Sequence, residues 1–405
     1  MKIEAPRGTF DVLPAEQPVR DAVVRAAESA AADYGYGRIT TPTFEDTELF
    51  ARTSGAGSDV VQKEMYTFQD QAGRLLTLRP EGTAPVARAY IEHGLHREPQ
   101  PVKTYYVGPF FRYAAPQKGR FREFWQIGYE AMGSDDPALD AELVQLFAEI
   151  ARRAGVSYTR LELNSIGDRE CRPQYIVALR AWLADHRDEL DEESRRKAET
   201  SPLRVFDTKN PAVQEALTHA PTIGESLCAA CREHFDAVRA CLDAYGIAYE
   251  LRPTLVRGLD YYTRTVWEFL NEDLAAAQSS ICAGGRYDYL IEEISGSPTP
   301  GVGWAAGVER MVLSREPVQP EPAIEIFFAF EDSSRRTEAL PLLARLRADG
   351  HSCETDYAGR SLKGQLTQAQ RLGAATIVIA HERGFTVRRR GEEDIEVAQI
   401  EDLPL

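Results

Sequence analysis

The sequence has no apolar run approaching the roughly 18 residues that a membrane-spanning helix needs, so we expect no membrane association. Its first seven residues also lack the apolar core of a signal peptide, which predicts a cytoplasmic protein. Six scattered cysteines in 405 residues do not form a disulfide framework. Basic residues are outnumbered, with 47 Lys and Arg against 63 Asp and Glu, giving a formal net charge of −16. This balance argues against indiscriminate binding of nucleic acid, because Lys and Arg supply the attraction to phosphate.

The composition is otherwise that of a folded globular protein, with 43% hydrophobic and 27% charged residues. At roughly 100–200 residues per domain, this length predicts two or three domains. The clearest boundary is the segment 316–322, which is rich in Pro and Glu. We therefore expect one domain over residues 1–320 and a second over residues 321–405.

Two segments differ in pattern from the mixed helices and short strands of the first domain. Between about residues 172 and 245 the sequence is charged and mostly helical without strands, which predicts a helical insertion. Beyond the boundary, strands and helices alternate regularly, which predicts a small α/β domain with parallel strands. The expected strands lie at 324–330, 353–357 and 376–380, and the expected helices at 337–348 and 362–372.

A predicted hairpin around the turn-rich segment 114–120 concentrates basic residues. They are Arg112, Lys118, Arg120 and Arg122. An arginine on one strand and a basic loop beyond it can hold a polyphosphate, although ordinary solvated surface charges explain the pattern as well.

The second strand of this hairpin alternates in polarity. Gln126, Gly128 and Glu130 fall on one face, and apolar residues fall on the other. Polar side chains on a buried face are unfavourable unless something pairs with them, which favours a ligand site here.

Three further segments carry candidate binding residues. Glu81, followed by Gly82 and Thr83, could hold a substrate ammonium group, with Gly82 permitting close approach, but a turn capping a helix is the alternative. Residues 257–262 and 283–288 place charged and aromatic residues next to glycines, and each could also be a structural turn.

The glycine-rich segment 301–310 superficially resembles a dinucleotide-binding fingerprint. Prolines precede it where a strand is required, and its last spacing is one residue too long. We therefore expect close packing of a strand on a helix that starts near Gly307, with Arg310 at the helix start.

Cys228 and Cys231, with His234 and Cys241, invite a zinc interpretation. The first three positions also fit one face of a helix, a stripe that Phe235 continues. Structural zinc sites usually draw their ligand pairs from separate turns. We therefore favour a buried helix face and assign no residue to a metal.

Taken together and in this order, these segments resemble the class II aminoacyl-tRNA synthetases, and among them the histidyl-tRNA synthetase family, over essentially the whole chain. The general motifs are the N-terminal signature at 7–14, motif 1 ending at Pro42, motif 2 from Phe111 to Glu130, and motif 3 from Gly301 to Arg310. The histidine-specific stretches are 161–167, 255–262 and 283–288.

The resemblance implies an α+β catalytic domain with a mainly antiparallel sheet, a helical insertion, and a C-terminal α/β domain that binds the anticodon. Basic residues at 359–363, at 383 and at 388–390 suit that role, with a solvated face as the alternative. The resemblance also implies a homodimer, formed through motif 1, and tRNA(His) as a partner.

The resemblance further implies a two-step reaction. L-Histidine and ATP, with Mg²⁺, give histidyl-adenylate and pyrophosphate, and the histidyl group then passes to the 3′ end of tRNA(His). The attacking carboxylate is ionised at neutral pH, so positioning and charge neutralisation by arginines should suffice. By match to the family, Arg112 and Arg257 are catalytic, and Arg112, Arg120 and Arg310 bind ATP.

The same match implies a histidine site. Glu81 and Thr83 would take the ammonium group and Gln126 the carboxylate, while Glu130 and Tyr262 would face the imidazole as acceptor and donor. The full implied set is Glu81, Gly82, Thr83, Arg112, Gln126, Glu130, Arg257, Tyr261 and Tyr262.

The sequence departs from the family at Ala114 and Ala115, where relatives usually carry a glutamate and an arginine, so the adenine contacts stay unassigned. The main alternative is the regulatory subunit of ATP phosphoribosyltransferase, a catalytically inactive relative. That protein typically loses the catalytic arginine stretch and the C-terminal domain, whereas Arg257 and a C-terminal α/β segment are present here. A protein-interaction scaffold has only the helical insertion in its favour.

Overall fold

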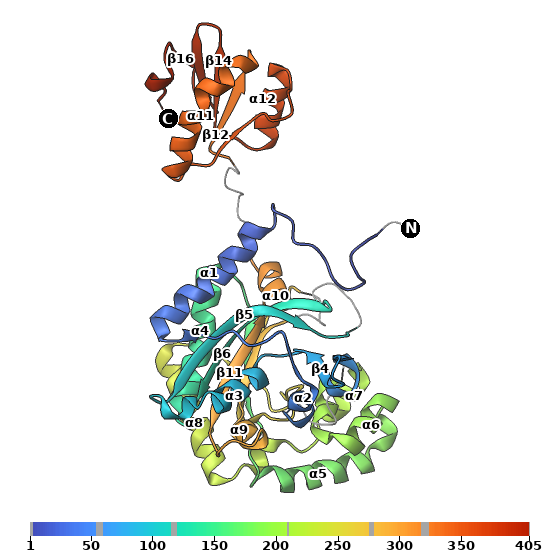
Figure 1. The fold of residues 1–405 in the computed structure, drawn as a ribbon. Coiled ribbons are helices and arrows are strands. Elements are labelled where there is room, and N and C mark those ends of the chain that lie inside the picture. Colours follow the sequence, from blue (N-terminus) through green and yellow to red (C-terminus); the bar gives the residue numbers. More distant parts are fainter. Residues whose placement is uncertain are drawn as a thin grey trace. The chain divides into compact units, whose positions relative to one another are not determined.

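The computed structural model describes residues 3–53, 60–114, 120–208, 210–274, 279–316 and 324–404. The chain divides into two compact units, Met1–Glu316 and Pro317–Leu405, which are described separately (Figure 1). The boundary expected between residues 320 and 321 falls within 317–323, outside the described residues.

An eight-stranded sheet forms the centre of the larger unit, with the order β1-β5-β6-β11-β10-β9-β7-β8. The outer pairs β1–β5 and β7–β8 are parallel, and the five pairs between them are antiparallel. The expectation of a mainly antiparallel sheet is therefore confirmed. The strands are β1 Gly37–Arg38, β5 Val102–Phe111, β6 Glu123–Met132, β7 Arg160–Ser165, β8 Glu250–Leu251, β9 Thr263–Leu270, β10 Ser280–Arg286 and β11 Gly301–Gly307.

Helices α1 (Gln17–Tyr34), α4 (Pro137–Ala154), α8 (Ala229–Tyr245) and α10 (Val308–Leu313) pack with this sheet into one hydrophobic core (Figure 1). The buried side of α1 follows the spacing of one helix face, because its apolar residues recur three and four positions apart. These buried residues are Val23, Ala26, Ala27, Ala30 and Ala31.

The central strand β6 separates this core from a second one, as its alternation predicts. Ile127, Tyr129 and Ala131 belong to the core with α1 and α4. The alternate residues of β6, starting at Gln126, point to the other face of the sheet, where α3 (Thr83–Glu92) and α9 (Leu290–Glu293) lie. A small sheet, in the order β2-β4-β3, completes the unit with α2 (Thr47–Thr53); its strands are β2 Phe44–Asp46, β3 Tyr66–Gln69 and β4 Leu75–Leu78.

The helical insertion has its own apolar core, formed by α5 (Arg172–Asp185), α6 (Glu192–Thr200), α7 (Pro211–Leu217) and short 3₁₀ turns. Helix α8, which the sequence analysis included in the insertion, does not join that core. Its Val238 and Leu242 belong to the core of the sheet instead. The self-contained part of the insertion therefore ends before Ala229.

The smaller unit holds a five-stranded sheet in the order β13-β12-β14-β15-β16. The first three strands are parallel, as expected, and β15 and β16 extend the sheet by antiparallel pairing that the sequence analysis did not foresee. Strand β12 is buried on both faces, which explains its continuous apolar sequence. The elements are β12 Ile326–Phe330, α11 Arg336–Ala348, β13 Cys353–Thr355, α12 Leu362–Arg371, β14 Thr376–His381, β15 Gly384–Arg389 and β16 Ile395–Val397.

A buried charge network ties the sheet to the helices that cover it. The fully buried Arg286 donates from Nε to Asp140 Oδ1 at 2.9 Å and from Nη1 to Asp288 Oδ1 at 2.8 Å. The second oxygen of Asp140 lies 2.9 Å from Nε2 of His234 on α8. Arg286, from one of the histidine-specific stretches, is thus a structural residue that joins β10 to α4.

Replacing this arginine should destabilise the larger unit strongly. In Arg286→Met, Asp140 and Asp288 lose the guanidinium that compensates their charges, so unfolding should become easier by about 3–5 kcal/mol. Urea unfolding followed by tryptophan fluorescence measures this unit, because all four tryptophans lie within it. The control Arg38→Met, which removes an exposed pair with Glu28, should change the stability by less than about 1 kcal/mol. Equal effects of the two substitutions would contradict the structural role of Arg286.

Candidate active site

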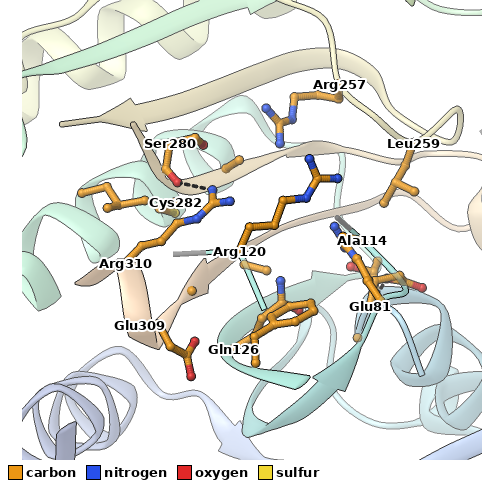
Figure 2. Close-up of a pocket in the computed structure, with 18 of the residues that line it drawn as sticks. Glu81, Ala114, Arg120, Gln126, Arg257, Leu259, Ser280, Cys282, Glu309 and Arg310 are labelled. Atoms are coloured by element: carbon orange, nitrogen blue, oxygen red, sulfur yellow. Dashed lines mark hydrogen bonds between the residues drawn. The ribbon is translucent and has the colours of Figure 1, made fainter. Parts of the chain in front are cut away.

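A cleft of about 270 Å³ opens over the central strands, on the face of the sheet that carries α3. Its walls come from β5, β6, β10, β11 and the start of α3, segments that are far apart in the sequence (Figure 2). The structure brings together in it nearly every candidate residue: Glu81, Gly82, Thr83, Arg112, Arg120, Gln126, Arg257, Tyr261, Tyr262 and Arg310. Glu130 is the exception.

Four arginines surround one end of this cleft, and Figure 2 shows Arg120, Arg257 and Arg310 extending toward a common space. Their partners hold them in place there. Arg112 donates from Nε to the Pro80 carbonyl at 2.8 Å, and Arg310 donates from Nη1 to the Ser280 carbonyl at 2.6 Å. Arg120 lies 2.6 Å from a carboxylate oxygen of Glu64, and Arg257 lies 3.4 Å from one of Glu268.

Charges of the same sign lie close together in this cluster. Burial lowers the pKa of Arg310, and the charges of Arg112 and Arg120 lower that pKa further. Burial also lowers the pKa of Arg112. Because a guanidinium stays protonated in proteins, the arginines repel one another and suit a multiply charged anion.

Glu81 supplies negative charge at another part of the cleft. Its carboxylate accepts hydrogen bonds from the backbone N–H groups of Thr83 at 2.7 Å and Ala84 at 3.0 Å. Burial nevertheless raises the pKa of Glu81 to about 7. The helix-turn interpretation therefore applies, and the ligand interpretation stays a prediction, because the carboxylate that binds the start of α3 also lines the cleft.

A tyrosine that the sequence analysis missed, Tyr106, fills the space beside Gly128 on the polar face of β6. A Cβ atom at Gly82 or at Gly128 would overlap the ring of Tyr106, so both glycines make room for that ring. Tyr106 pairs directly with Gly128 across the hairpin. Counting outward from the predicted turn could have found this pair, since register fixes which residues face each other.

Glu130 lies behind the cleft wall and not among the residues that line it. Its carboxylate accepts hydrogen bonds from the hydroxyl groups of Thr83 at 2.7 Å, Tyr287 at 2.6 Å and Tyr106 at 3.4 Å. Burial raises the pKa of Glu130 to about 8. The expectation that Glu130 faces a ligand directly is therefore revised, because hydroxyl groups stand between its carboxylate and the cleft.

The glycine-rich segment 301–307 forms strand β11 and not the turn before a helix. Val302, Trp304 and Ala306 point into the core with α1 and α4, so the alternate positions face the site. A Cβ at Gly303 would overlap the Glu130 carboxylate, which explains the need for glycine there. Helix α10 follows at Val308, close to the expected start, and carries Arg310.

The antiparallel sheet and its arginine-lined cleft are those of a class II aminoacyl-tRNA synthetase. The structure is similar to that of apo histidyl-tRNA synthetase from S. aureus, with a TM-score of 0.80 and 34% sequence identity, covering 98% of this chain and 97% of that one. A protein described as an ATP phosphoribosyltransferase regulatory subunit/histidyl-tRNA synthetase from Bacillus halodurans C gives a TM-score of 0.69 at 23% identity, which is a likeness of fold alone.

The sequence comparisons identify the family. The family model for histidyl-tRNA synthetase matches residues 8–311. The chain is 48% identical to the histidine–tRNA ligase of Rubrobacter xylanophilus, over 97% of this chain and 96% of the relative, and 44% identical to that of Desulforamulus reducens, over 99% and 96%. The chain belongs to the histidyl-tRNA synthetase family.

The packing of Tyr106 should control the shape of the cleft. In Gly128→Ala the added methyl group overlaps the tyrosine ring and displaces it, and overpacking of this kind costs about 1–3 kcal/mol. We expect the affinity for L-histidine, measured by calorimetry, to fall about tenfold or more. Gly37→Ala on β1 is the control, since its nearest neighbour would be the Lys103 carbonyl at 3.9 Å. Unchanged affinity in Gly128→Ala would refute the role of Tyr106.

Proposed function

We propose that this chain is a histidine–tRNA ligase, which activates L-histidine with ATP and then transfers it to the 3′ end of tRNA(His). The observation that carries the proposal is the convergence of Arg112, Arg257 and Arg310 on a cleft that also presents the buried carboxylate of Glu81. Such a cleft suits a triphosphate next to an ammonium group. The family membership supplies the amino acid and the tRNA.

In the first step, a carboxylate oxygen of histidine forms a bond to the α-phosphorus of ATP. The bond from that phosphorus to the bridging oxygen breaks, and pyrophosphate leaves with the electron pair. No general base is needed, because the attacking carboxylate is already ionised. We assign Arg112 and Arg257 to the α-phosphate, where they align the two reactants and neutralise charge that develops on the phosphoryl oxygens.

Arg120 and Arg310 are proposed to hold the outer phosphates of ATP. The described carboxylates that line the cleft are Glu81 and Glu309, and Glu309 already accepts from the Trp125 N–H at 3.1 Å and from Arg20 at 2.9 Å. Mg²⁺, held by phosphate oxygens and water with at most one or two carboxylates, fits this site better than an all-protein cage. When bound, it supplies further neutralisation of the leaving pyrophosphate.

For histidine, we propose that Glu81 and Thr83 bind the ammonium group. Oε1 of Gln126 is buried in the cleft wall and has no hydrogen-bond partner among the described residues, so it can accept a hydrogen bond from a ligand. The amide nitrogen of Gln126 can donate a hydrogen bond to the carboxylate of histidine. We assign Tyr262, with Tyr261 beside it at 4.7 Å between ring centroids, to the imidazole. Glu130 acts behind them as a positioning residue through the hydroxyls of Thr83 and Tyr106.

The C-terminal unit is proposed to bind the anticodon. Several residues of its expected basic surface are already paired, Arg388 with Asp394 at 2.6 Å and Arg389 with Glu392 at 3.8 Å. We favour the hollow along α12, which is lined by Arg360, Lys363 and Arg371; Arg360 pairs with Asp356 at 2.6 Å, whereas Lys363 and Arg371 have no ion pair among the described residues. Close charges on one helix face suit a phosphate backbone.

We further propose a homodimer that works in the cytoplasm, where aminoacyl-tRNA is consumed. One face of the three-stranded sheet next to motif 1 exposes two aromatic side chains, Phe44 (49% accessible in the single chain) and Phe68 (42%), whose ring centroids lie 6.0 Å apart. Apolar side chains gathered on one exposed face suit a protein interface. Within the described residues, no helix is long and apolar enough to cross a bilayer.

Histidine-dependent exchange of labelled pyrophosphate into ATP tests the proposed function directly. The wild-type chain should catalyse exchange, and Arg257→Ala should slow it by about 10²–10³-fold, the effect of losing one donor to the transition-state charge. Arg252→Ala, an exposed arginine five residues earlier, is the matched control and should retain full exchange. A folded wild-type protein that catalyses no exchange would favour the regulatory-subunit alternative.

The raised pKa of Glu81 predicts a pH-dependent affinity for histidine. Below its pKa of about 7 the carboxyl group gains a proton and no longer attracts the ammonium group, so affinity should fall up to about tenfold per pH unit below that value. Calorimetry between pH 8 and pH 6 should show a larger fall in histidine affinity for the wild type than for Glu81→Gln. Comparing the two proteins at each pH cancels the titration of the ligand. Parallel profiles would rule out Glu81 as the ammonium-binding residue.

A further inference from the structure

Four side chains that can bind a metal ion meet where the helical insertion joins the sheet: Asp168, Cys171, Cys228 and Cys231. Their ligand atoms all lie within 4.8 Å of one another. Asp168 and Cys171 follow strand β7. Cys228 is the N-cap of helix α8, and Cys231 lies in its first turn. The two residues of each pair are three positions apart in the sequence. The sequence analysis set zinc aside for lack of a second turn, and the fold supplies that turn from 57 residues earlier in the chain (228 − 171 = 57).

Two distances within this cluster match the edges of a tetrahedral zinc site. A tetrahedron with Zn–S bonds of about 2.3 Å and a Zn–O bond of about 2.1 Å has S···S edges of about 3.8 Å and S···O edges of about 3.6 Å. In the structure, the sulfur atoms of Cys171 and Cys231 are 3.8 Å apart. Sγ of Cys171 lies 3.5 Å from Oδ1 of Asp168.

The surrounding backbone is arranged to bring these groups together. Gly167 has a positive φ of 65°, and a Cβ atom there would lie 2.6 Å from Sγ of Cys171. Backbone N–H groups of Glu170 and Cys171 donate to Oδ1 of Asp168 at 3.0 and 3.4 Å and orient its carboxylate. Nη2 of Arg264 lies 3.7 Å from Oδ2 of Asp168. Metal-binding carboxylates are usually oriented by such a neighbour that does not itself touch the metal.

The other residues of the zinc interpretation lie outside this cluster. His234 is occupied by Asp140 at 2.9 Å, and Cys241 lies ten residues beyond Cys231 on the same helix. Cys228 occupies the N-cap of α8 without making a side-chain capping bond, although Ser, Thr, Asp or Asn is preferred there. A ligand role explains a cysteine at this position better than capping does.

We propose that Asp168, Cys171, Cys228 and Cys231 form a structural zinc site that fastens both ends of the helical insertion to the catalytic sheet. Four protein ligands leave no open position, which is the mark of a structural site. The half-exposed Cys228 gives the ion a path of entry, while the other three ligands are buried. Binding converts the three thiols to thiolates and releases their protons.

This site would also steady the histidine pocket. Arg172, the neighbour of Cys171, donates to the backbone carbonyls of Gly167 at 3.1 Å and Tyr262 at 2.7 Å. The turn that carries two of the ligands is therefore bonded directly to the segment that carries Tyr262. Loss of the ion should loosen both the insertion and this wall of the cleft.

Metal analysis of the full-length chain, purified without chelators and reconstituted anaerobically with zinc, tests the proposal. We expect about one zinc per chain in the wild type and below about a tenth of that in Cys231→Ser and Cys228→Ser. Serine caps helices well, so Cys228→Ser should stay folded, as circular dichroism can verify. Cys241→Ser, on the same helix, is the matched control and should keep the metal.

X-ray absorption at the zinc edge provides the second readout. The wild type should show three sulfur ligands and one oxygen, and Asp168→Cys should retain zinc with four sulfur ligands. Substoichiometric zinc in the reconstituted wild type, full retention in Cys231→Ser, or a coordination shell of light atoms alone would overturn the proposal.

Discussion

The antiparallel pairing of β6 with β11 is the constraint on which the rest of the larger unit depends. Along β6, Ile127 and Tyr129 join the helix-covered core, whereas Gln126 faces the cleft and Gly128 faces the ring of Tyr106. Its partner β11 follows the same rule, with Trp304 in the core and glycine or alanine on the other side. A shift of one residue in this pairing would bury Gln126 and expose Tyr129, so the register is strongly specified.

The space that the glycines leave is occupied by the polar groups of the site. Tyr106 lies against Gly82 and Gly128, and the Glu130 carboxylate lies against Gly303. Tyr106, Thr83 and Tyr287 then meet on that carboxylate, which satisfies its hydrogen bonds in a buried place. Because low-dielectric surroundings strengthen such bonds, this network makes a rigid floor for the cleft. The charges that act on substrate are carried by the arginines above it.

The acidic excess of the whole chain conceals this local arrangement. A net charge of −16 argues against an anion partner, yet four arginines line one cleft. Electrostatic attraction falls off within about 10 Å in salt, so a partner responds to local charge and not to the total. Many of the acids, meanwhile, pair with arginines on the surface, as Glu149 does with Arg152 at 2.7 Å.

Much of the fold and most of the site followed from the sequence. Helix α1, the polarity of β6 and the alternating C-terminal elements lie as the patterns indicated, and ten of the eleven candidate residues line one cleft. Such features depend on neighbours a few residues apart or on motifs of fixed spacing. Where the analysis departed from the structure, the deciding contact joined distant segments. Helix α8 packs on α4 through His234 and Asp140, which are 94 residues apart, and so leaves the insertion.

The sequence by itself therefore determined the family, the two faces of strand β6 and the arginines of the cleft, because periodicity and short motifs depend on residues that are close together in the sequence. Tertiary structure alone decided that Glu130 lies behind the wall, that Tyr106 fills the place left by Gly128, and that Arg286 is structural. It also decided that Asp168 and Cys171 meet Cys228 and Cys231. The physical reason is the same in each case: a side chain's role depends on which distant groups surround it, and only the packed chain brings them within bonding distance.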